Sequence, residues 1–267
     1  MADLVQIIRG GVKRAVPPSS IDGNARRFTP TATKTAAYTA AAWDHVLVDA
    51  SAAAGNFAVT MPGSPSVGDQ LRVTMVNDHA TRVVTLDGNG SDAIETEANN
   101  SPGRYALVLE GDSALLEWVG GGCGWAVIAD EITPHVGRIT GAANQTTNTA
   151  ATWTKTTQLT TLSVDIGRIA ESNKFTVRRS GTYAVHGCVY PNSNTGASVL
   201  FYSSIYLNGG SAVSHLNYIN TSTVAYASPL SNVMTLSADD YVELYFYHSN
   251  ANVGAASYSY FYVSEIR

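Results

Sequence analysis

Along most of the chain, apolar and aromatic residues recur at every second position in short runs. Clear examples are residues 71–76, 241–247 and 258–263. Period-two spacing of β-branched and aromatic side chains is typical of a pleated strand and not of a helix. Turn residues such as Asp87-Gly88-Asn89-Gly90 separate the runs at intervals of about ten residues, which is the spacing of sandwiches and barrels. The pattern therefore predicts an all-β protein.

The predicted strands fall into two blocks. Residues 35–131 and residues 153–267 each hold a full set of strands and turns, and we expect two tandem β-sandwich or jelly-roll domains. Residues 132–152 are small and polar, and they are predicted to form a linker or an extended connecting segment. Residues 1–34 are rich in glycine and proline, which forbid a long helix, so we expect an extended N-terminal arm. A short strand at residues 4–8 would have no partner inside this arm.

Charge is distributed unevenly over these segments. The arm carries a balance of +4, residues 35–131 carry −10, and the rest of the chain carries +1, within an overall charge of −5. A basic arm ahead of an acidic domain suggests an electrostatic tether to an acidic surface. The alternative is a solubilising leader that folds back on its own acidic neighbour. The residues expected to anchor the arm are Arg9, Lys13, Arg14, Arg26 and Arg27.

Tyrosine is concentrated in the last third of the chain, where twelve of the 14 tyrosines lie between Tyr183 and Tyr262. In runs such as residues 202–207 and 241–247, both faces of the expected strand are apolar or aromatic. One face would be buried inside a sandwich, and the other would lie against a second subunit or a ligand. Tyrosine suits both roles, because a rigid apolar ring and a polar hydroxyl serve protein interfaces and sugar faces alike.

Composition narrows the class of protein. Only 14% of residues are charged, while small polar residues are abundant, which fits particle-surface proteins better than metabolic enzymes. No apolar run approaches the length of a membrane span, and residues 1–9 are too short for a secretory signal, so we expect folding in a cytoplasm without export or membrane contact. Cys123 and Cys188 lie in different predicted domains, so two free thiols are favoured over a disulfide.

Two segments resemble catalytic or metal-binding motifs, but an ordinary turn is favoured for both. Gly111-Asp112-Ser113 is similar to an esterase nucleophile block, but no Asp-x-x-His motif supplies a base, and a hairpin turn is favoured. Oxygen-bearing side chains lie close together at Asp87, Asn89, Ser91, Asp92 and Glu95, as in a calcium-binding loop. Ala98 stands where such a loop needs its bidentate glutamate, so a solvated turn is favoured over a bound ion. An acidic chain without a basic-aromatic stripe is not expected to bind nucleic acid. No enzyme activity, metal or cofactor is predicted.

Two resemblances add to this reading. The succession of Val46-Leu47-Val48-Asp49, Val59-Thr60-Met61-Pro62, Val67-Gly68-Asp69, the turn at residues 87–90 and a glycine-rich turn into Trp125 resembles a β-domain of bacteriophage fibre and virion-surface proteins. The second block is similar to tumour-necrosis-factor-like and complement-globular-head-like jelly rolls. That likeness rests on Gly181-Thr182-Tyr183, the hairpin at Asn208-Gly209, the entry to the strand at residues 241–244 and the aromatic last strand, although Asp239-Asp240 replaces the usual Gly-Asp.

These resemblances imply a homotrimeric structural protein of the virion surface. The expected role is capsid decoration: the protein would stabilise the phage head by binding the major capsid protein. The alternative is a short tail fibre or receptor-binding protein that contacts tail proteins and recognises a host glycan through its C-terminal jelly roll. If the family's assembly carries over, the tyrosines form the trimer interface, or in the alternative a binding face. The residues assigned to it are Tyr202, Tyr206, Tyr245, Tyr247, Tyr260 and Tyr262.

Overall fold

The computed structural model describes residues 5–9, 12–16, 28–95, 105–145, 151–191, 199–210, 219–221, 227–249 and 255–266. Within these ranges the regular elements are β-strands, apart from one 3-10 turn at Gly121–Cys123, so the predicted all-β fold is confirmed. No helix in this part of the chain is long and apolar enough to cross a membrane. The chain divides into two compact units, residues 1–77, 86–100 and 110–131, and residues 78–85, 101–109 and 132–267.

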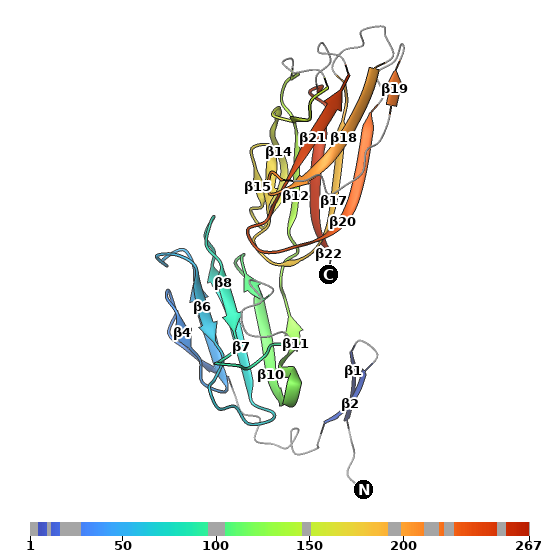
Figure 1. Cartoon of the computed structure of the whole chain (residues 1–267). Coiled ribbons are helices and arrows are strands. Elements are labelled where there is room, and N and C mark those ends of the chain that lie inside the picture. Colours follow the sequence, from blue (N-terminus) through green and yellow to red (C-terminus); the bar gives the residue numbers. More distant parts are fainter. Residues whose placement is uncertain are drawn as a thin grey trace. The chain divides into compact units, whose positions relative to one another are not determined.

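The predicted arm contains paired strands. β1 (Val5–Arg9) and β2 (Val12–Val16) form an antiparallel two-stranded sheet (Figure 1), so the expectation that a strand here lacks a local partner is wrong. The charged Lys13 and Arg14 interrupt the apolar pattern of the second strand and hide it from a period-two search. β3 (Thr29–Pro30) pairs in parallel with β5 (Asp44–Asp49), so the last residues of the predicted arm belong to the sheet of the first unit.

The first unit mixes parallel and antiparallel pairs. Its main sheet has the order β11-β10-β7-β5-β3, in which β5 and β7 are parallel while β7, β10 and β11 are antiparallel. A separate four-stranded sheet has the order β4-β6-β8-β9, and its β9 is not part of the first unit. The strands not yet given bounds are β4 (Tyr38–Thr39), β6 (Phe57–Thr60), β7 (Gln70–Asn77), β8 (Val84–Asp87), β9 (Ala106–Leu107), β10 (Ser113–Gly120) and β11 (Gly124–Asp130).

Alternation along β7 shows why these residues form a half-buried strand. Leu71, Val73 and Met75 are buried, while the residues between them are half-buried. Successive side chains of a strand point to opposite faces, so one apolar residue in two is enough to fill a core. Each such side chain contributes roughly 1.5–3 kcal/mol of burial free energy.

The second unit is a jelly roll of two antiparallel sheets. One has the order β14-β12-β22-β17-β20, and the other has the order β15-β16-β21-β18-β19, with β13 also paired to β21. Figure 1 shows β17, β18, β20, β21 and β22 running alongside one another through this unit. The strands are β12 (Val136–Gly141), β13 (Thr154–Lys155), β14 (Leu159–Ile166), β15 (Ala170–Glu171), β16 (Lys174–Thr176), β17 (Gly181–Val189), β18 (Val199–Leu207), β19 (Ile219–Thr221), β20 (Ser228–Leu236), β21 (Tyr241–His248) and β22 (Tyr260–Ile266).

The prediction of a linker at residues 132–152 is wrong for its first half. β12 pairs with β14 on one side and with β22 on the other, so it is an interior strand of the jelly roll. Gly137 and Gly141 resemble loop residues, which is why the sequence predicts a connecting segment here. A side chain at Gly137 would overlap the Phe175 ring, so the close approach of the opposite sheet requires glycine there. Residues 146–150 of the predicted linker lie outside the described residues.

The core of the second unit lies between its two sheets. Phe175 and Phe261 meet there with ring centroids 5.2 Å apart, and Phe201 stacks on Phe246 at 5.7 Å. All four rings are buried. Because the inward positions already supply a full aromatic core, the side chains on the outward faces of the two sheets are available for other contacts.

Candidate functional site

The six tyrosines predicted as one face lie on two different sheets. Tyr202 and Tyr206 are on β18, and Tyr245 and Tyr247 are on the neighbouring β21, where Tyr247 faces Tyr202. The remaining two, Tyr260 and Tyr262, are on β22 in the other sheet, paired with β12 and β17. The chain therefore has two tyrosine-bearing faces, and each has to be described separately.

Four of the tyrosines gather around one tryptophan. The ring centroid of Trp153 lies 5.7 Å from that of Tyr247, 6.2 Å from that of Tyr206 and 6.5 Å from that of Tyr202. Tyr202 and Tyr247 are 5.5 Å apart, and Tyr206 stacks on Tyr245 at 4.0 Å. We call these five residues (Trp153, Tyr202, Tyr206, Tyr245 and Tyr247) the Trp153 cluster. Trp153 was not among the predicted site residues, because it lies beside a polar, threonine-rich stretch.

The Trp153 cluster occupies the outward face of β18 and β21. Phe201 and Ile205 alternate with Tyr202 and Tyr206 along β18 and are buried in the core. On β21 the same alternation buries Leu244 and Phe246 and turns Tyr245 and Tyr247 outward. All five members of the cluster are half-buried, so each ring keeps part of its surface open to solvent.

A charged margin borders the cluster. Lys155 on β13 donates to the Glu243 carboxylate, whose side chain is only 7% exposed. Lys174 pairs with Glu171 at 3.0 Å and lies 4.6 Å from the centroid of the Tyr241 ring. Each of these two lysines is therefore paired with a carboxylate.

Burial shifts the pKa of two cluster tyrosines. Burial, and after it the Glu243 carboxylate, raises the pKa of Tyr245 above its ordinary value. Burial also raises the pKa of Tyr206. A tyrosine at its ordinary pKa of about 10 is already protonated at neutral pH, so both phenols can donate hydrogen bonds there.

The outward face of the other sheet carries a different surface. Strand register aligns Ile166, Val136, Ser264, Ala184 and Val233 in one row across β14, β12, β22, β17 and β20. We call these five residues the apolar row. Val233 is 62% exposed, and Ile166 is also exposed at the opposite end.

Tyr262 and Tyr260 flank the apolar row on β22. The Tyr262 ring lies 5.8 Å from the His186 ring, and the Arg138 guanidinium lies 5.7 Å from the Tyr260 ring centroid. Tyr258, at 59% exposure, contacts Tyr190 edge to face at 4.7 Å. Aliphatic and aromatic side chains are thus exposed together over this sheet.

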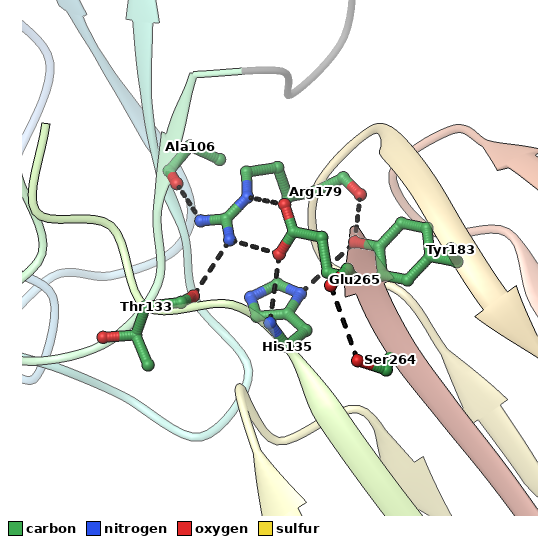
Figure 2. A network of polar contacts seen from close by, with 7 residues as sticks. All are labelled: Ala106, Thr133, His135, Arg179, Tyr183, Ser264 and Glu265. Atoms are coloured by element: carbon green, nitrogen blue, oxygen red, sulfur yellow. Dashed lines mark hydrogen bonds and ion pairs between the residues drawn. The ribbon is translucent and has the colours of Figure 1, made fainter. Parts of the chain in front are cut away.

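A buried ion pair stabilises the second unit (Figure 2). The Arg179 guanidinium donates to Glu265 at 3.1 and 2.6 Å and to the carbonyl oxygens of Ala106 and Thr133 at 3.0 and 3.1 Å. The two side chains are 1% and 5% exposed. Burial acts to raise the pKa of Glu265, but the bonds from Arg179 and the His135 amide outweigh it, so that pKa lies below its usual value. Nothing in the sequence pairs Arg179 with a residue 86 positions later.

The predicted arm and rejected sites can also be placed. Arg9 lies on β1, and Lys13 and Arg14 lie on β2, whereas Arg26 and Arg27 are outside the described residues. The Ser113 hydroxyl lies 3.4 Å from a carboxylate oxygen of Glu131. Cys123 and Cys188 are free thiols. Within the described ranges, no three His, Cys, Asp or Glu side chains gather in a way that could hold a metal ion.

Comparisons with known proteins give weak likenesses in structure. No protein-family model and no curated protein matches the chain. Murine APRIL at pH 5.0 covers 50% of this chain and 100% of its own, with 11% identity and a TM-score of 0.38. The globular domain of a zebrafish complement 1qA protein covers 51% and 98%, with 14% identity and a TM-score of 0.38. Rabbit GITRL covers 50% and 94%, with 12% identity and a TM-score of 0.31. The second unit is identified as a jelly roll by the strand order of its two sheets, and not by these likenesses.

Proposed function

We propose that the chain is a non-catalytic structural protein that assembles as a homotrimer through the outward face of the β14-β12-β22-β17-β20 sheet. The observation that carries this proposal is the apolar row, in which four apolar residues and the central Ser264 cross all five strands, with Ile166 and Val233 exposed at its two ends. Exposed apolar side chains on one face of a soluble protein mark an interaction site. Tyr260 and Tyr262 beside the row are of the residue type enriched at interfaces. The threefold symmetry is taken from the sequence resemblance to trimeric jelly rolls.

Replacement of Val233 by arginine tests the assembly. Val233→Arg would place a charge in the interface without disturbing the core, because the wild-type side chain already faces solvent. By sedimentation equilibrium, wild type should have about three times the 28.2 kDa mass of one chain, and the variant should be monomeric. The control is Val67→Arg in the first unit, where valine is 77% exposed and the mass should be unchanged. A trimeric Val233→Arg variant would place the interface elsewhere.

Within this assembly, the proposed role is decoration of a bacteriophage head, with the protein made in the host cytoplasm and bound to the major capsid protein. The basic N-terminal segment supports this proposal, because it gives the acidic chain one cationic region with which to contact acidic capsid rims. A protein that binds only the assembled lattice stabilises that lattice by mass action.

The anchoring role is tested on particles stripped of this protein. Replacing Arg9, Lys13, Arg14, Arg26 and Arg27 together by glutamine should leave a folded oligomer that no longer binds them. Wild-type binding should weaken as salt rises, because screening acts on exposed charges. A glutamine variant that decorates particles as well as wild type would refute the anchor.

A short tail fibre or receptor-binding protein is the second candidate. One observation favours it: the Trp153 cluster lies on the sheet opposite the proposed interface and stays half-exposed. Trimerisation through the apolar row would leave that sheet outside the contact.

A further inference from the structure

Five aromatic rings lie on the outward face of β18 and β21 without serving the core. The inward positions of the same strands already bury Phe201, Ile205, Leu244 and Phe246. The rings of the Trp153 cluster contact one another instead, and all remain half-buried. Partly exposed aromatic surface is costly to hydrate, so a cluster of this size points to a ligand or partner.

The polar groups of the cluster narrow the ligand chemistry. The tyrosine rings carry hydroxyls, and those of Tyr206 and Tyr245 stay protonated at neutral pH. At the margin, Lys155 is paired with Glu243 and Lys174 with Glu171. Because both lysines are already paired with carboxylates, this surface offers neither of them to a charged ligand. It suits a neutral molecule with apolar faces and many hydroxyl groups.

We propose that the Trp153 cluster is a binding site for a neutral carbohydrate, with pyranose rings stacked on Trp153 and its neighbouring tyrosines. Sugar rings present a C–H face that packs on an aromatic ring, and their hydroxyls can bond to phenols. The Trp153 ring is tilted by 42° to Tyr202, by 56° to Tyr206 and by 52° to Tyr247. These ring faces point in different directions, which suits more than one sugar unit.

A protein partner fits this face less well. Among the described residues of the second unit, the large exposed aliphatic side chains are Leu162, Val164, Ile166, Val233 and Ile266. Those five belong to the strands of the opposite sheet, on β14, β20 and β22. The face that holds the Trp153 cluster therefore offers aromatic and hydroxyl groups, whereas the large exposed aliphatic side chains described in this unit lie on the sheet proposed as the subunit interface.

The test is an array of neutral oligosaccharides built from hexoses, 6-deoxyhexoses and N-acetylhexosamines, with sialylated and sulfated glycans as the charged arm. The full-length chain should bind a subset of the neutral glycans and none of the charged ones selectively. Calorimetric titration of wild type with the neutral array glycans that bind should then give a measurable Kd. The array uses purified protein without particles, so its failure would leave the capsid proposal untouched.

Substitutions in the cluster identify the site. Trp153→Ala should weaken binding at least about tenfold, as expected for an aromatic side chain that the bound sugar covers. Trp153→Phe should retain part of the affinity. Tyr258→Ala is the matched control, because it removes an exposed aromatic ring from the turn before β22, outside the cluster, and should leave the Kd unchanged. If Trp153→Ala fails to fold by circular dichroism, Tyr247→Ala takes its place with the same expected loss.

Three results would overturn the proposal. They are the absence of selective binding to neutral glycans, selectivity for charged glycans alone, and wild-type affinity in a folded Trp153→Ala variant. Loss of self-association in that variant, with no glycan bound by wild type, would instead identify the cluster as a protein interface.

Discussion

The buried pair of Arg179 and Glu265 gives the sharpest prediction for stability. Arg179→Met removes four hydrogen bonds and leaves the Glu265 carboxylate without its cation at 5% exposure. Breaking one partner of a buried pair costs about 3–5 kcal/mol, because the remaining charge is left in a low-dielectric site. Protonation of Glu265 limits the loss, since a neutral carboxyl is cheaper to bury. We therefore expect the free energy of unfolding of the second unit to fall by about 3 kcal/mol or more.

The assay is urea denaturation of the full chain, followed by circular dichroism, with thermal unfolding as a second measure. A loss of that size should lower Tm by about 6 °C or more for a unit of this length. Arg179→Met/Glu265→Leu is the decisive comparison, because an apolar pair carries no unpaired charge. It should be more stable than Arg179→Met alone, although the His135 amide loses its acceptor. The single variant Glu265→Leu completes the comparison. If the losses in free energy of unfolding of Arg179→Met and Glu265→Leu add up to the loss in the double variant, the two side chains are not coupled and the reasoning is refuted.

Two further predictions concern Glu265 and Gly167 of the second unit, the latter compared with Gly111 of the first unit. Because the folded pKa of Glu265 is depressed, its stabilisation is present above the unfolded value of about 4.3 and is lost as pH falls through the folded pKa. Acid unfolding of Glu265→Gln should therefore depend less on pH below about 4.3 than that of wild type, and equal slopes would contradict this. Gly167→Ala should destabilise more than Gly111→Ala: both glycines have φ near +90°, but a side chain at Gly167 would overlap the His135 ring while one at Gly111 meets open space. Equal Tm values for the two variants would show that the overlap costs nothing.

Local patterns predicted the strands well where one face is buried. β7 alternates strictly between buried and half-buried residues, and β7, β18 and β21 each contain a run predicted from period-two spacing. β12 was missed because its two glycines resemble a loop, although Gly137 is needed for close packing against Phe175 and Gly141 for close approach to the Ser257 backbone. β3 was missed because two residues are too short to show a period.

The candidate site was only partly predictable, because it depends on which strands become neighbours. The sequence identified the tyrosines of the Trp153 cluster but joined them with Tyr260 and Tyr262, which strand pairing places on another sheet. No local sequence pattern links Trp153 to the tyrosines. The pairing of β13 with β21 in the fold brings Trp153 next to Tyr247. The Arg179–Glu265 pair is likewise a product of the fold.

The copy number of this chain per purified phage particle tests the central claim most directly. It can be measured by stained-gel densitometry against the major capsid protein. The account predicts a ratio commensurate with the capsid lattice, with the chain present in multiples of three. A few copies per particle would instead support a tail fibre or receptor-binding protein. Absence of the chain from particles would contradict the virion role altogether.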